Sequence, residues 1–125
     1  MSTRSFIGKQ LTDGSITGVY CHFDGYPDGV GATLKEHYVD PTKVDALLAL
    51  GSISSLGPEI GQRHDYNDRS HDWTTAYHRD CGERLEPAMK YDTLRDMLRS
   101  VGSNLGAEYA YVFNAGAWET YEPTL

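Results

Sequence analysis

The sequence predicts an α+β domain in which an antiparallel sheet, built from an N-terminal and a C-terminal hairpin, carries about three helices on one face. Three observations favour this class. β-Forming segments lie at both ends of the chain, amphipathic segments of helical period lie between them, and turn residues separate nearly all of them. Because 125 residues suffice for one hydrophobic core, we expect residues 1–125 to form a single domain.

The N-terminal hairpin is predicted from two β-forming segments, Ser5–Leu11 and Ile16–Phe23, which flank Asp13-Gly14. An Asp-Gly pair favours a type I′ turn, which needs positive φ angles at both central residues. Gly8 and Gly18 interrupt the alternation of the two strands. A glycine inside a strand often marks a bulge or a close approach of two backbones.

Two helices are predicted after a cluster of turn residues at 24–29. The first has one apolar face, formed by Val30, Leu34 and Tyr38. The second has Asp40 as its N-cap and ends before Gly51. Pro41 suits the first position of this helix, whose buried face is formed by Val44, Leu47 and Leu48.

The segment from Gly51 to Trp73 is predicted as a long loop, and its second half is almost wholly polar. A loop of this length in a small domain is expected to be functional or mobile. Beyond it, Thr74–His78 is predicted as a strand. Tyr91–Gly102 is the best-marked helix of the chain, with an apolar face formed by Leu94, Met97, Leu98 and Val101.

The chain closes with a second hairpin, whose strands Glu108–Phe113 and Ala117–Tyr121 flank a turn at residues 114–116. The period of two places three aromatic side chains on one face of the first strand, namely Tyr109, Tyr111 and Phe113. The predicted order of elements is therefore ββ-αα-β-α-ββ.

Composition excludes several classes of protein. The chain has 11 basic and 18 acidic side chains and a net charge of −7, whereas a protein that coats phosphates needs a basic surplus. It has no run of 18 apolar residues to span a membrane, and its N-terminus lacks the apolar core of a signal peptide. Cys21 and Cys81 are too few for a disulfide scaffold, so we expect a soluble protein with reduced thiols.

A first candidate site is residues 20–27, at the end of a predicted strand. His22 and Asp24 share a face there, and with Cys21 they are residue types of a metal site or a thiol–imidazole pair. However, neighbouring residues of a strand point to opposite faces, so Cys21 and His22 cannot readily bind the same metal ion. The alternative is a structural turn in which Asp24 binds backbone amides and Tyr26 packs.

A second candidate site is residues 77–83, which contain His78, Arg79 and Asp80. This triplet also occurs in the catalytic loop of kinases, but the remainder of that signature is missing. The alternative is structural: Arg79 pairs with a carboxylate, and Asp80 begins a turn that Gly82 completes.

The third candidate site is the polar loop at residues 63–72. Its spacing matches no zinc motif, and it fails as a calcium loop because Arg69 and Ser70 stand where a ligand and a glycine are required. The alternative is a solvated loop. The candidate binding residues of the three sites are His22, Asp24, Tyr26, Arg63, His64, Asp65, Asp68, His71, Asp72, His78, Arg79 and Asp80. None is assigned a catalytic or metal-binding role, and no cofactor is expected.

Several motifs of the chain resemble a family of small uncharacterised phage and prophage proteins. They are YCHFDGYP at residues 20–27, with Val30-Gly31, LKEHY and GSISSL after it; AYHRD-x-GE at 76–83; and EYAYVF at 108–113, with Trp118. Cys81 stands where the family motif has a basic residue, which argues against an obligatory role for this cysteine. The resemblance spans nearly the whole chain and implies a phage accessory protein that acts in the cytoplasm of the bacterial host. No catalytic residue carries over from it.

Charge and resemblance together lead us to expect a stoichiometric inhibitor of a host defence system, of the anti-CRISPR or anti-restriction type. It would bind a defence protein complex through acidic and aromatic surface, without direct nucleic-acid or membrane binding. The oligomeric state is open, a homodimer included. One alternative is a nucleotide-sequestering protein, with an anion site formed by Gly25, Gly29 and Gly31 and by Arg63, Arg69 and Arg79. Another is a metal-dependent hydrolase that uses His22, His64, His71 and His78 with Asp24 or Asp80.

Overall fold

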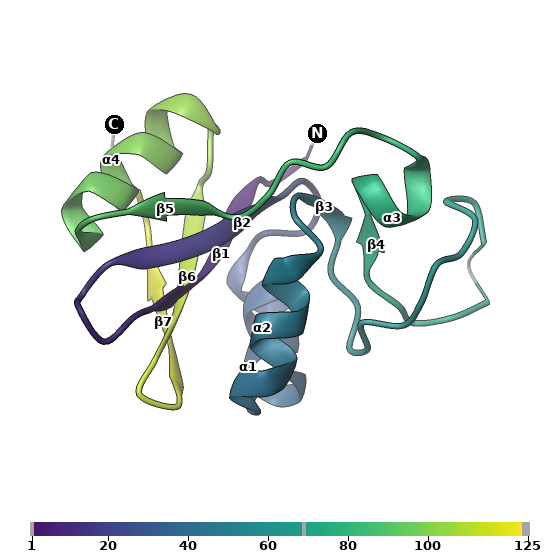
Figure 1. Cartoon of the computed structure of the whole chain (residues 1–125), viewed down its shortest axis with the longest axis horizontal. Helices are drawn as coiled ribbons and strands as arrows, with labels where there is room; N and C mark the ends of the chain where they lie inside the picture. The colour runs from purple at the N-terminus through teal and green to yellow at the C-terminus, as the bar shows by residue number, and fades with distance from the viewer. Residues whose placement is uncertain (1, 69, 124–125) are drawn as a thin grey trace.

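A seven-stranded mixed sheet forms the centre of the fold, which is α+β as the sequence predicts. The computed structural model describes residues 2–68 and 70–123. The strands run in the order β4-β3-β2-β1-β6-β7, and β5 pairs with β2 off this path (Figure 1). Their bounds are β1 Ser5–Gln10, β2 Ile16–Cys21, β3 Ile53–Ser55, β4 Thr75–Ala76, β5 Met89–Tyr91, β6 Tyr109–Asn114 and β7 Ala117–Tyr121.

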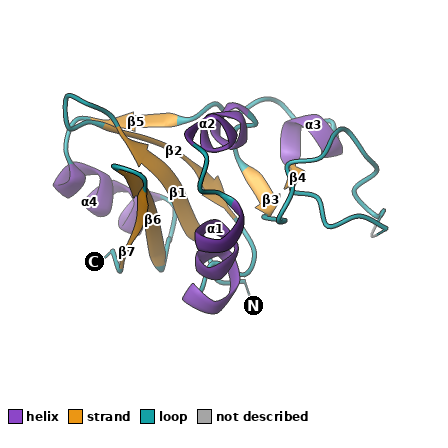
Figure 2. Ribbon diagram, turned by 90° about the horizontal axis from the view of Figure 1, so that it is seen from below, coloured by secondary structure: helices purple, strands orange, loops and turns teal. Residues whose placement is uncertain are grey.

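The sheet is covered by helices on both faces, not on one face as the sequence predicts. Ile7 of β1 lies in a core with the helices that precede β3, whereas its neighbour Phe6 lies in a second core with the helix that precedes β6. Figure 2 shows these helices on opposite sides of the strands. The physical reason is the run of buried residues in β1 and β6, since a strand that is apolar on both faces needs cover on both.

Two strand pairs are parallel, which is a second difference from the predicted antiparallel sheet. The N-terminal and C-terminal hairpins are present, but they join through β1 and β6, whose chains run in the same direction. β3 also runs parallel to β2, with Cys21 opposite Ile53. Short β3 falls within the segment 51–73 that the sequence predicts as loop.

The helices are α1 (Ala32–His37), which follows a single π-helical turn at Pro27–Gly31, then α2 (Pro41–Ala49), α3 (Tyr77–Cys81) and α4 (Leu94–Asn104). The predicted start and stop of α2 are confirmed. The Asp40 side chain accepts a 2.9 Å hydrogen bond from the Thr42 amide, and Gly51 adopts a φ of 77°. Among the described helices, none combines the length and the apolar character that a bilayer span requires.

Three local predictions are wrong. The loop between β1 and β2 is a three-residue turn with a glycine bulge, not a type I′ turn, because Gly14 has a positive φ and Asp13 does not. The predicted helix at 91–102 begins later, since Thr93 caps α4 through the Asp96 amide and the residues before it form β5. The predicted strand at 74–78 ends at Ala76, whose amide donates to the Asp80 side chain as α3 begins.

Candidate functional site

A tightly held loop follows β2 and contains the first predicted site. We call residues 22–29 the Tyr26 loop. The Gly25 amide donates to the Thr3 carbonyl at 2.9 Å, and the Tyr111 hydroxyl donates to the Gly25 carbonyl at 2.6 Å. The Val30 amide donates to the Asp24 carbonyl at 2.8 Å. These bonds fix the backbone of the loop to the N-terminus, to β6 and to the start of the helical segment.

Close packing explains two of the glycines in this loop. A Cβ on Gly25 would lie 2.7 Å from the Thr3 carbonyl oxygen, and a Cβ on Gly29 would overlap the Asp24 carbonyl oxygen. Asp24 itself has a φ of 57°, in the left-handed region that Asp tolerates better than most residues. These close contacts therefore hold the backbone of the loop in one conformation.

The side chains of the Tyr26 loop point mostly to solvent. Phe23 is 39% exposed and Tyr26 43% exposed, and the carboxylates of Asp24 and Asp28 are exposed beside them. The ring of His22 contacts the Phe23 ring edge-on, with 4.5 Å between their centroids. A rigid backbone thus presents two aromatic side chains and two negative charges.

The three glycine amides that were expected to bind an anion are not free. Gly25 donates to Thr3, and Gly29 and Gly31 both donate to the Tyr26 carbonyl. The anion site that the sequence predicts at Gly25, Gly29 and Gly31 is therefore not available, because these amides already bind carbonyl groups of the protein itself. Of the arginines expected beside it, Arg69 lies outside the described residues.

The carboxylate of Asp80 is the centre of the second predicted site and ties it to the third. Its side chain is buried, and it accepts hydrogen bonds from the Ala76 amide (2.8 Å), the His64 amide (3.2 Å) and Arg79 Nε (2.9 Å). Burial by itself raises the pKa of Asp80, but these hydrogen bonds outweigh burial and hold the pKa below its usual range. The carboxylate is therefore an ionised anchor for the polar loop, and Arg79 pairs with a carboxylate as predicted.

His64 is held in one orientation beside this anchor. Its Nδ1 lies 2.8 Å from the Gln62 carbonyl oxygen, and its Nε2 lies 3.3 Å from Thr75 Oγ1. The ring contacts Trp73 edge-on, and His71 stacks on Trp73 with 3.8 Å between ring centroids. Both histidines of the loop thus contact the ring of Trp73.

His64 lies between Thr75 and Asp80, and these three residues are of the types that serve as acid, base and nucleophile in a catalytic triad. Thr75 is only 2% exposed, so its hydroxyl does not reach solvent or substrate. The nearby thiol of Cys81 is a poor nucleophile, because burial and the carboxylates of Glu83 and Asp80 raise its pKa. The arrangement is therefore structural.

The histidines and aspartates of the hydrolase alternative do not form a metal site among the described residues. His22 Nδ1 lies 2.6 Å from the Tyr20 hydroxyl, and His78 Nδ1 lies 2.8 Å from the Glu83 carbonyl oxygen, so each ring is engaged by a group of its own segment. Asp68 accepts hydrogen bonds from Ser70 in a local turn. Within residues 2–68 and 70–123, no group of three or more His, Cys, Asp or Glu side chains is placed to hold a metal ion.

Four of the predicted residues do share one cavity. Arg63, His64, Asp65 and Asp80 line a hollow of about 550 Å³ together with Tyr66 and Cys81. Tyr66 also lines a smaller hollow with Phe23 and Asp24 of the Tyr26 loop. The second and third predicted sites therefore form one region, which adjoins the first.

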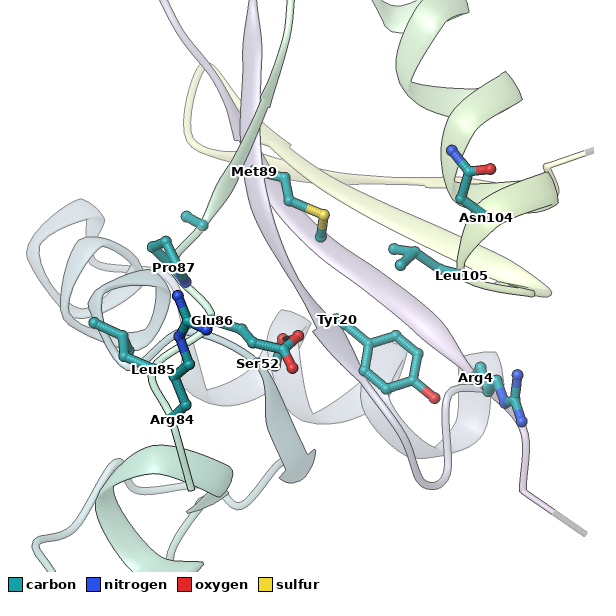
Figure 3. Close-up of a pocket in the computed structure, with 11 residues that line it drawn as sticks. Arg4, Tyr20, Ser52, Arg84, Leu85, Glu86, Pro87, Met89, Asn104 and Leu105 are labelled. Atoms are coloured by element: carbon teal, nitrogen blue, oxygen red, sulfur yellow. Dashed lines mark hydrogen bonds between the residues drawn. The ribbon is translucent and has the colours of Figure 1, made fainter. Parts of the chain in front are cut away.

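A larger cavity lies elsewhere, and the sequence did not predict it. It is a groove of about 800 Å³, whose walls include Arg4, Tyr20, Arg84, Glu86, Met89 and Leu105 (Figure 3). We call it the split-edge groove. Its residues come from the N-terminus, β2, the segment before β5, and the end of α4, so no local pattern in the sequence marks it.

Comparison of the chain with protein-family models, with curated proteins and with solved structures finds no match. The site is therefore interpreted from its own geometry.

Proposed function

We propose that this chain is a phage accessory protein that inhibits a bacterial defence complex, of the anti-CRISPR or anti-restriction type, by binding it stoichiometrically in the host cytoplasm. The observation that carries this proposal is the Tyr26 loop, in which a fixed backbone presents Phe23 and Tyr26 together with the exposed carboxylates of Asp24 and Asp28. The resemblance of residues 20–27 to phage proteins supports the biological context.

The loop has the properties of a binding surface rather than of an enzyme site. Aromatic side chains supply much of the affinity in protein interfaces, because they bury a large area and lose little conformational entropy. A loop that is ordered before binding pays no further ordering cost when it docks. Nothing in the loop is positioned to activate a nucleophile, since His22 is engaged by Tyr20.

The charge of the chain indicates what kind of partner surface would be complementary to the Tyr26 loop. The chain carries a net charge of −7, and the exposed aromatics of the loop are flanked by acids. Such a surface is complementary to a basic patch, of the kind a nuclease complex uses to hold nucleic acid. We therefore expect association that is fast at low salt and weakens as salt is added.

The test is protection of a phage in bacteria. Strains with a defined CRISPR or restriction system would express the wild-type chain or the double variant Phe23→Ala/Tyr26→Ala, and phage plating would be compared. We expect the wild-type chain to raise plating efficiency and the double variant to lose most of this effect. Val39→Ala is the matched control, because Val39 is 62% exposed and lies outside the loop.

Binding would then be measured directly with the purified defence complex whose activity is blocked. A one-to-one complex that weakens in the double variant supports the proposal. Failure to protect against every system in the panel contradicts it, and so does full activity of the double variant.

A further inference from the structure

The split-edge groove lies where the outer edge of β2 changes its partner. At Gly18 that edge pairs with Met89 of β5, and at Cys21 it pairs with Ile53 of β3. Tyr20 lies between these two pairings, so the chain that passes from α3 to β5 crosses over an open part of the sheet. The groove is the space that this change of partner leaves, and it is separate from the Tyr26 loop.

Two arginines lie at opposite ends of this groove (Figure 3). Among the described residues, neither Arg4 nor Arg84 has a side-chain hydrogen bond or an ion pair. In a protein with seven more acids than bases, an unpaired guanidinium group at either end of one cavity can bind an anion. The guanidinium of Arg4 lies close to Gly106, at the end of α4.

The floor between the arginines suits a flat ring. Tyr20 forms its centre, and the hydroxyl of Tyr20 is held 2.6 Å from His22 Nδ1, which fixes the plane of the ring. Met89 lies beside it, with its sulfur held by the Tyr91 hydroxyl at 3.4 Å, and Leu105 faces Met89 across the groove. Aromatic and thioether side chains bind planar rings by stacking and dispersion contacts.

One further polar group lies in the groove. The carboxylate of Glu86 points toward Tyr20 and lies 3.5 Å from the Ser52 hydroxyl (Figure 3). It is placed to accept hydrogen bonds from a hydroxyl or amino group of a ligand. The volume of about 800 Å³ falls within the range of small-molecule sites, roughly 300–1,000 Å³.

We propose that the split-edge groove binds a nucleoside phosphate, with its base on Tyr20 and Met89 and its phosphate on an arginine. The unpaired cations, the fixed aromatic floor and the acceptor together match the phosphate, the base and the sugar or amino groups of such a ligand. This site is distinct from the glycine anion site that the sequence predicts, and it does not depend on the inhibitory function of the Tyr26 loop.

Calorimetric titration of the full chain tests the proposal with AMP, GMP, CMP and UMP, their diphosphates, adenosine and inorganic phosphate. We expect saturable binding of at least one nucleoside phosphate and much weaker binding of adenosine or phosphate alone. Arg4→Ala/Arg84→Ala should weaken that binding at least tenfold. Arg95→Ala/Arg99→Ala is the matched control, since it removes the same charge from exposed positions on α4 and should change the affinity less than threefold.

A methyl NMR spectrum supplies a readout that does not depend on the variants. The Met89 methyl signal should shift on addition of the nucleotide, whereas that of Met97, which is buried against the sheet, should not. Absence of binding by every nucleoside phosphate tested overturns the proposal. Equal binding of inorganic phosphate overturns the base contact, and equal weakening by the control variant would show non-specific attraction.

Discussion

The Tyr111 hydroxyl donates a 2.6 Å hydrogen bond to the Gly25 carbonyl oxygen, and so joins two residues 86 positions apart in the chain. Tyr111 is fully buried in β6, and the bond reaches from the sheet to the backbone of the Tyr26 loop. Replacing Tyr111 with Phe leaves this carbonyl without its partner. We expect Tyr111→Phe to lower the free energy of unfolding by about 1–3 kcal/mol, measured by urea denaturation.

A neighbouring tyrosine supplies the control. Tyr109 lies two residues earlier on the same face of β6, it is only partly buried, and its hydroxyl has no hydrogen-bond partner among the described residues. Tyr109→Phe should therefore change stability by less than about 0.5 kcal/mol. Equal effects of the two substitutions would show that the bond to Gly25 does not hold the loop.

Asp80 makes the stability of the protein depend on pH in a defined direction. The pKa of Asp80 is lower in the fold than its ordinary value, because hydrogen bonds to the carboxylate outweigh the opposing effect of burial. Such a group stabilises the fold fully above its unfolded pKa of about 3.9, and this contribution is lost as pH falls through the folded pKa. We expect Asp80→Asn to cost about 3 kcal/mol at pH 7, since Arg79 loses its buried partner.

The measurement is urea denaturation of wild type and Asp80→Asn between pH 7 and strongly acidic pH. The difference between the two proteins should be constant near neutrality and should shrink below about pH 4. Asp68→Asn is the comparison, because the Asp68 carboxylate accepts its hydrogen bonds from Ser70 in an exposed turn and not from a buried arginine. A difference that stays constant into acid would contradict an ionised Asp80 in the folded protein.

The parts of the fold that have a local signal could be predicted from the sequence. Asp40 and Gly51 bound α2 as expected, because a cap and a left-handed glycine act within one turn of the helix. The strand β3 has three residues and is defined by its pairing with β2, so nothing near Ile53 in the sequence marks it. The side of the sheet that α4 covers likewise depends on how the two hairpins join.

The candidate sites differ in the same way, because some of their contacts join adjacent residues and others join distant segments of the chain. The sequence predicts that Arg79 pairs with a carboxylate, and the structure shows that this carboxylate belongs to the adjacent residue, Asp80. The bonds of Asp80 to His64 and of Tyr111 to Gly25 join distant segments, and no spacing reveals them. The split-edge groove is the extreme case, because Arg4 and Arg84 become neighbours of one cavity only when the sheet has formed.

A substitution at Gly18 tests the close approach of strands β1 and β2, which the glycines in these strands indicate. Gly8 and Gly18 lie opposite each other, and the ring of Phe6 packs over both. A Cβ on Gly18 would overlap the Ile7 carbonyl oxygen and the Phe6 ring. We expect Gly18→Ala to lower the free energy of unfolding by about 3 kcal/mol, because the ring and the strand must both move. Thermal and urea denaturation measure this loss.

The control for this substitution is the preceding residue. Thr17 lies in the same strand and is only partly buried, so Thr17→Ala should cost less than about 1 kcal/mol. If Gly18→Ala were as stable as wild type, the ring of Phe6 would not lie over the glycine pair.

The two cysteines should differ in their reaction with iodoacetamide. Cys21 is fully buried, its thiol donates to the Phe23 carbonyl at 3.6 Å, and burial raises its pKa to about 12. Cys81 is partly exposed, although burial and nearby carboxylates raise its pKa as well. Because only an accessible thiolate reacts, we expect slow labelling of Cys81 in the native protein at pH 8 and labelling of Cys21 only in concentrated guanidinium. Peptide mapping by mass spectrometry distinguishes the two positions, and native labelling of Cys21 at the rate of Cys81 would contradict its place in the core.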